Sequence, residues 1–206
     1  MDCRKRTCLS LAVTVSLLVA GPVAAESGVG EREKAALAAT GQLIKQLGGA
    51  LKQHMSEGGP EAAIRVCSEL APGISGEISR ANGWRMTRVS GRVRNPLLGM
   101  PDAWERKVLS DFESRVGKGE NPADMSFSEV VEEGGTSYFR FMKAIGTKPV
   151  CLTCHGNEEI PEGVRKKLST AYPMDRATGY RKGDLRGAVS IKQPMDIPLP
   201  AAMPAR

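Results

Sequence analysis

The sequence predicts one α+β domain, because helical patterns fill the first half of the chain and strand patterns are interspersed in the second half. The chain has 206 residues, which is room for about one domain, and it contains no internal repeat. Hydrophobic residues make up 41% and charged residues 25%, a composition that is typical of globular proteins and excludes intrinsic disorder. Because the chain has only five Cys and two His, the positions of these residues are informative.

Residues 1–25 have the pattern of an export signal. A basic stretch at residues 4–6 precedes an apolar run at residues 9–20, and residues 23–25 end in the small side chains that a signal peptidase requires. The apolar run is short for a bilayer, so we expect no stable membrane span once the signal is cleaved. Cleavage would reduce the net charge from +6 to +4 and leave an exported, periplasmic protein. No basic run remains to bind nucleic acid.

The first half of the mature chain is predicted to be helical. Apolar residues recur at helical spacing over residues 31–55, which predicts a long amphipathic helix that ends at Gly58 and Gly59. Pro60 suits the first turn of a second helix, whose apolar face includes Cys67. We therefore expect Cys67 to point inward. A further helix over residues 74–82 ends at Gly83.

The second half alternates predicted strands and helices. Residues 84–89, 137–145 and 187–193 have strand patterns, and residues 102–116 and 161–171 have helical ones. Residues 96–101 are predicted to be a turn-rich loop. Because residues 194–206 are rich in proline, we expect an irregular C-terminal tail after a domain that spans residues 26–193.

The segment Cys151-Leu152-Thr153-Cys154-His155 carries the clearest chemistry in the chain. The two thiols of a Cys-x-x-Cys-His motif can form thioethers with the two vinyl groups of one haem, and the adjacent His then becomes the proximal iron ligand. Haem of this c type is attached outside the cytoplasm, in agreement with the predicted export signal. The motif therefore predicts one covalently bound haem c, with Cys151, Cys154 and His155 as its attachment and ligand residues.

Three other functions of these cysteines are weighed against haem attachment. A thioredoxin-like redox pair needs a helix after its Cys-x-x-Cys, and Gly156 and Asn157 interrupt one here. A zinc site would combine the three mature cysteines with His54 or His155, but the chain lacks a second Cys-x-x-Cys. A structural disulfide is the third possibility.

The motif leaves the sixth iron ligand open. A methionine thioether would raise the redox potential, but no methionine of the sequence has a distinctive setting. His54 would give bis-His ligation, and Cys67 would give a soft, anionic thiolate that favours ferric iron. From the residue pattern alone, methionine, His54, Cys67 and an open site remain alternatives.

Several ordered blocks of the sequence, between residues 63 and 190, match those of a known family. The blocks are AIRVCSELAP (63–72), VS (89–90) with RNP (94–96), PDAWE (101–105), CLTCHG (151–156), YPMDRATGY (172–180) and GDLRGAVS (183–190). With these blocks the chain resembles the small PAS-like c-type haem domains, first described as a domain of unknown function and with a cyanobacterial haem protein as prototype.

The resemblance implies a PAS-like fold: an antiparallel sheet flanked by helices, with a long N-terminal helix and covalently bound haem. In the prototype, the motif His and the Cys of the first block ligate the iron, which implies His155 and Cys67 here. The family is proposed to sense redox state or small ligands. We therefore expect a redox or small-ligand sensor that acts on a periplasmic redox or signalling protein, with a soluble electron-transfer cytochrome c as the alternative.

Two arginines near this site are candidates for binding the haem propionates. Arg92 and Arg94 lie close to Asn95, and a guanidinium binds carboxylates through two parallel hydrogen bonds. No catalytic constellation is visible in the sequence, so we expect a binding protein and not an enzyme.

Overall fold

The computed structural model describes residues 23–158 and 160–200. The predicted export signal lies largely in residues 1–22, outside the described residues, as does the end of the tail from residue 201. The α-helices are α1 (Val23–Arg65), α2 (Ala71–Asn82), α3 (Pro96–Gly99), α4 (Ala103–Gly117), α5 (Leu152–His155) and α6 (Glu162–Ala171). The shorter turns are the π-helix η1 (Val66–Leu70) and the 3₁₀-helices η2 (Pro122–Asp124) and η3 (Pro149–Cys151).

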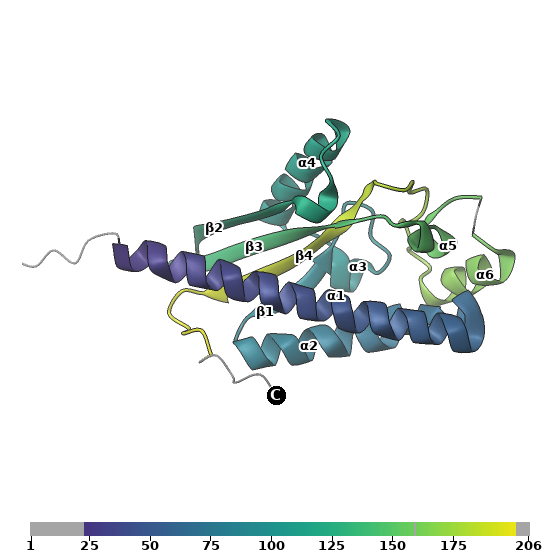
Figure 1. Ribbon diagram of the computed structural model, residues 1–206, viewed down its shortest axis with the longest axis horizontal. Coiled ribbons are helices and arrows are strands. Elements are labelled where there is room, and N and C mark those ends of the chain that lie inside the picture. Colours follow the sequence, from purple (N-terminus) through teal and green to yellow (C-terminus); the bar gives the residue numbers. More distant parts are fainter. Residues whose placement is uncertain (1–22, 159, 201–206) are drawn as a thin grey trace, which may run out of the picture.

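The strands form one antiparallel sheet in the order β1-β4-β3-β2, which confirms the predicted α+β fold with its helix-flanked sheet and long N-terminal helix. They are β1 (Arg85–Val89), β2 (Ser126–Glu133), β3 (Thr136–Gly146) and β4 (Leu185–Pro194). Figure 1 shows α1 lying along the sheet with α2 beside it, α4 on the other side, and α5 and α6 near the turn at the end of α1. The sheet is therefore covered on both faces.

The central strand β3 shows why both faces are covered. Successive side chains of a strand point to opposite faces. Phe139 and Phe141 accordingly pack with Leu43 of α1, whereas Met142 packs with Phe112 of α4. All four aromatic and methionine side chains lack solvent exposure, so each helix layer is held by its own apolar cluster.

Helix α1 bends where the sequence predicts a break. Gly59 has a left-handed φ of 70°, and Pro60 follows it in the first turn of the next helical segment. The bend lets the chain turn back toward the sheet through η1 and α2. At the other end of α1, Arg32 hydrogen-bonds Gln193 and donates to the carbonyls of Met195 and Ile197, each at 2.9 Å, which ties the start of the irregular tail to the domain.

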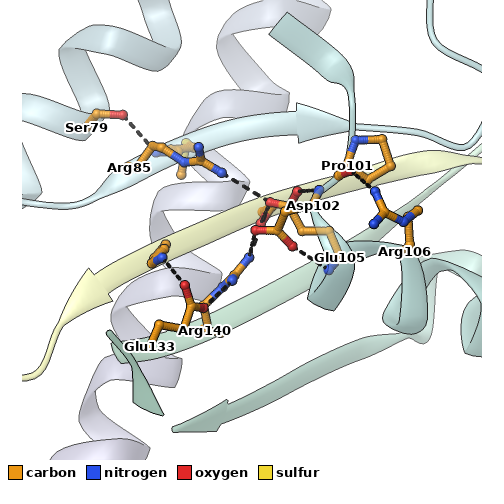
Figure 2. A network of polar contacts seen from close by, with 11 residues as sticks. Ser79, Arg85, Pro101, Asp102, Glu105, Arg106, Glu133 and Arg140 are labelled. Atoms are coloured by element: carbon orange, nitrogen blue, oxygen red, sulfur yellow. Dashed lines mark hydrogen bonds and ion pairs between the residues drawn. The ribbon is translucent and has the colours of Figure 1, made fainter. Parts of the chain in front are cut away.

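A charged network around the buried Glu105 and Arg140 fastens the start of α4 to the sheet (Figure 2). Asp102 and Glu105 form a reciprocal capping box, with each backbone N–H donating to the other side chain at 2.8 Å. Arg140 of β3 donates to Asp102 at 2.7 Å and to Glu133 at 2.8 Å, and Ser190 of β4 donates to Glu105 at 2.6 Å. The family block PDAWE thus serves to anchor α4.

The structure contains elements that the sequence does not predict, among them a strand, a single helical turn and a π-helix. Strand β2 lies where no element is expected, because Phe127 and Val130 are 40% exposed on this edge strand and its sequence lacks a clean alternation. The expected loop at residues 96–101 contains the single turn α3, and the π-helix η1 interrupts the second helical segment at Cys67. No helix among residues 23–158 and 160–200 is long and apolar enough to cross a membrane.

Candidate haem-binding site

The Cys-x-x-Cys-His motif occupies one compact turn between β3 and α6. Cys151 ends η3, and Cys154 and His155 lie in α5. Helix α5 ends after four residues because Gly156 is extended. One helical turn therefore presents both thiols and the imidazole together, which is the arrangement that two thioethers and a proximal ligand require.

The loop after α6 fixes the orientation of His155. The Nδ1 of His155 lies 2.7 Å from the carbonyl oxygen of Ala177, and because a carbonyl only accepts, Nδ1 carries the proton. The same loop donates from Gly179 to the Gly156 carbonyl at 2.7 Å and from Tyr180 to the His155 carbonyl at 3.0 Å. Nε2 is left with the lone pair that a metal ligand needs.

The charge state of His155 suits the same role. Burial is the main cause that lowers the pKa of His155 to about 3, and the positive charges of Arg186 and Arg94 lower it further. The imidazole is therefore neutral near neutral pH, and a neutral imidazole is the form that binds iron.

A pocket joins the motif to the bend of α1. It has about 110 Å³ of enclosed space and continues into an open mouth. Five of the predicted site residues line it: Cys67, Arg94, Cys151, Cys154 and His155. Its walls are mainly apolar and include Leu51, Met55, Ala63, Ile64, Val150, Leu168 and Tyr172.

Cys67 reaches this pocket from the π-helix η1, where the backbone is locally widened. Such π-helical turns occur frequently at functional sites. Among the described residues that line the pocket, Met55 offers a thioether, whereas His54 is not part of the lining. Met55 has no distinctive setting in the sequence, because its position at the pocket depends on how α1 bends.

The donor set of the pocket fits a c-type haem. It combines the two thiols of the motif, a neutral imidazole whose Nε2 keeps its lone pair, and a third thiol from another element, within apolar walls. Burial raises the pKa of the Cys154 thiol, so this sulfur is neutral, as it would be in a thioether. The enclosed space of about 110 Å³ is smaller than an ordinary ligand cleft of about 300–1,000 Å³.

Arg94 is buried behind the motif and has several partners in the protein. Its Nε donates to Asp175 at 3.0 Å, and its Nη2 donates to the carbonyls of Cys154 at 2.5 Å and Ala177 at 3.3 Å. Arg94 therefore joins the motif to the loop that orients His155. Its proposed contact with a propionate stays a prediction.

Arg92 is bound to the same loop but does not line the pocket. Its guanidinium stacks on the Tyr180 ring at 3.6 Å from the ring centre, and Nη1 donates to the carbonyls of Thr178 and Gly179 at 3.0 and 3.3 Å. A propionate contact of Arg92 also stays a prediction.

The structure also bears on the other functions considered for the cysteines. Cys67, Cys151 and Cys154 are free thiols, so no disulfide joins them. Within the described part of the chain, no three His, Cys, Asp or Glu side chains are grouped so that they could hold a metal ion, as a zinc site would require. Helix α5 is too short to be the helix that follows a thioredoxin-like motif.

Comparison with known proteins places the chain in a family. Residues 24–194 match the model of the Tll0287-like family. The fold is similar to the crystal structure of the cyanobacterial heme-protein Tll0287, with a TM-score of 0.60 and 27% sequence identity over 80% of this chain and 95% of that chain. No protein with a curated description matches the chain. The chain therefore belongs to the Tll0287-like family.

Proposed function

We propose that this chain is an exported protein that binds one haem c covalently through Cys151 and Cys154, with His155 as the proximal iron ligand. The observation that carries the proposal is the pocket, where both thiols and a neutral, oriented imidazole come together. Similarity to a heme-protein of the same family supports it independently. When bound, the haem would supply one-electron redox chemistry at its iron.

The sixth ligand in this proposal is the thiolate of Cys67. Cys67 lines the pocket from a different element than the motif, and the π-helical turn directs that segment toward it. A thiolate is anionic and soft, so it stabilises ferric iron more than ferrous iron and lowers the redox potential. Met55 is the competing donor, because it lines the same pocket.

The role that follows from this ligation is sensing of redox state or of a small ligand. An iron–thiolate bond weakens when the iron is reduced, because the iron then carries less positive charge. Loss of the bond would release Cys67 in η1, between α1 and α2, and a periplasmic redox or signalling protein would read the change. The competing function is electron transfer, in which both ligands stay bound in both oxidation states.

The first test is covalent haem. The full chain is produced in a host that attaches c-type haem in its periplasm, and the pyridine haemochrome spectrum of the purified protein is recorded. We expect the spectrum of haem c in the wild type and its loss in the double variant Cys151→Ala with Cys154→Ala. A wild type without haem c refutes both sensing and electron transfer.

The second test identifies the sixth ligand. Electronic and EPR spectra of the ferric protein are compared for Cys67→Ala, Met55→Leu and His54→Ala. We expect the low-spin spectrum of a thiolate-ligated iron to disappear only in Cys67→Ala, because Met55 and His54 would not contact the iron. An unchanged ferric spectrum in Cys67→Ala overturns thiolate ligation, and a change confined to Met55→Leu assigns the ligand to Met55.

A further inference from the structure

Arg186, at the start of β4, points at the ligating side of His155. Its Nε lies 3.5 Å from Nε2 of His155, at the outer limit of a hydrogen bond. The Arg186 guanidinium also lies 5.2 Å from the centre of the Tyr180 ring, which meets the His155 ring edge-on. Arg186 thus occupies the approach to the nitrogen that an iron would need.

The charge of Arg186 is not balanced within the described part of the chain. None of the ion pairs among the described residues includes Arg186. Asp175, the acid beside the motif, is paired with Arg94 at 3.0 Å. Arg186 is half-buried, and a cation that is partly withdrawn from water is costly unless an anion reaches it.

The neighbouring arginines differ from Arg186 in this respect. The Arg94 guanidinium donates to one carboxylate and two carbonyls, and the Arg92 guanidinium donates to two carbonyls and stacks on Tyr180. Among the described residues, the guanidinium of Arg186 makes one hydrogen bond, and its acceptor is His155. Most of its donors are therefore available to a planar anion, which a guanidinium binds through two parallel hydrogen bonds.

We propose that Arg186 shields Nε2 of His155 in the haem-free chain and pairs with a haem propionate once the iron takes that nitrogen. This inference rests on the proposed function. A propionate is a carboxylate, so it supplies both the charge and the shape that the free donors of Arg186 require. Arg186, rather than Arg92 or Arg94, is then the main propionate partner.

The test compares the haem-loaded variants Arg186→Gln and Arg186→Lys with Arg176→Gln. Arg176 is exposed, so its variant removes the same charge from the surface. Loss of a half-buried positive charge near the iron favours ferric iron. We expect Arg186→Gln to shift the ferric–ferrous equilibrium on the order of tenfold, a drop of about 59 mV in midpoint potential for a one-electron couple. Arg186→Lys should recover most of this drop, and Arg176→Gln should leave the potential unchanged.

A second readout covers the case in which Arg186→Gln does not fold. The propionate bending vibration in the resonance Raman spectrum responds to hydrogen bonding, so it should shift in Arg186→Lys and not in Arg176→Gln. Equal potentials in the wild type and Arg186→Gln, or an unmoved vibration in Arg186→Lys, overturn the inference. Because both readouts are taken on protein with a haemochrome spectrum, these failures leave the proposed function intact, whereas missing haem in the wild type refutes that function.

Discussion

His155 owes its tautomer and its neutral state to groups distant in the sequence. The Ala177 carbonyl fixes its tautomer, and burial together with Arg186 and Arg94 keeps it neutral. The local motif predicts which residues attach a haem, because the spacing of the thiols is itself the chemical requirement. It does not predict these supporting groups, which reach His155 through the folding of the chain.

The roles of the arginines show the same limit. Sequence proximity to Asn95 suggested Arg92 and Arg94 as propionate partners, whereas the structure gives both of them partners in the loop at residues 175–180. Arg186 lies in a family block, but its approach to His155 depends on how β4 enters the sheet. A sequence shows which side chains can donate hydrogen bonds. It does not show which of these donors lack a partner in the folded chain.

Replacement of Arg94 tests its structural role. Arg94→Gln breaks a pair in which both side chains are about nine-tenths buried, and it leaves Asp175 without its partner. We expect the free energy of unfolding to fall by about 3 kcal/mol, measured by urea denaturation. Arg176→Gln, on the same loop but exposed, should cost less than about 0.5 kcal/mol. Equal losses in the two variants would contradict the role assigned to Arg94.

The lowered pKa of Glu133 predicts that the free energy of unfolding depends on pH. Hydrogen bonds from Lys192, and then from Arg140, hold the pKa of Glu133 below its ordinary 4.5. The unfolded chain therefore binds the proton more readily, so the contribution is complete above pH 4.5 and is lost as the pH falls through the folded pKa. We expect the unfolding free energy of Glu133→Gln to fall less than that of the wild type as the pH is lowered. The difference should be roughly 1 kcal/mol or less, because the Glu133 carboxylate is 38% exposed. A fall as large as that of the wild type would contradict this.

At the scale of elements, the helices were predicted better than the strands. Gly59 and Pro60 determine the bend of α1 through their own backbone preferences, and Gly83 ends α2 in the left-handed conformation. Strand β2 is stabilised by its pairing with β3, and its exposed Phe127 gives no sign of a buried face. The π-helix at Cys67 likewise depends on packing and leaves no sequence signature.

The pairing of β1 with β4 depends on one glycine. Gly187 has a φ of 151°, and a Cβ there would lie 2.3 Å from the carbonyl oxygen of Val89. We expect Gly187→Ala to lower the free energy of unfolding by about 2–4 kcal/mol in urea denaturation. Gly41 of α1 is the matched control, because a Cβ there meets nothing within 4 Å. Gly41→Ala should raise stability by about 0.5–1 kcal/mol. A neutral Gly187→Ala would refute the close approach.

At the scale of the whole molecule, the sheet and its two helix layers position the candidate site at one end (Figure 1). The segment from α1 to α2 brings Cys67, and the segment from β3 to β4 brings the motif and the loop that orients His155. A change of iron ligation would therefore act where the segment from α1 to α2 meets the segment from β3 to β4. The proposed release of Cys67 would act in η1, which joins α1 to α2, and this position suits the proposed sensor.

Redox-resolved spectroscopy distinguishes a sensor from an electron carrier. With Cys67 as ligand, we expect a midpoint potential well below zero and a change of axial ligation on reduction, seen in spectra recorded during a potentiometric titration. Cys67→Ala should raise the potential and abolish the ligand change, while Met55→Leu should alter neither. A potential above zero with the same ligands in both oxidation states would instead favour the soluble electron-transfer cytochrome.

The most direct test of the central claim is the intact mass of the denatured protein after periplasmic production. We predict the mass of a chain that begins at Glu26 and carries one haem that denaturation does not remove, since both thioethers are covalent. The variant with both Cys151 and Cys154 replaced by Ala should have the mass of its own chain without haem. A wild-type mass without haem would contradict the account.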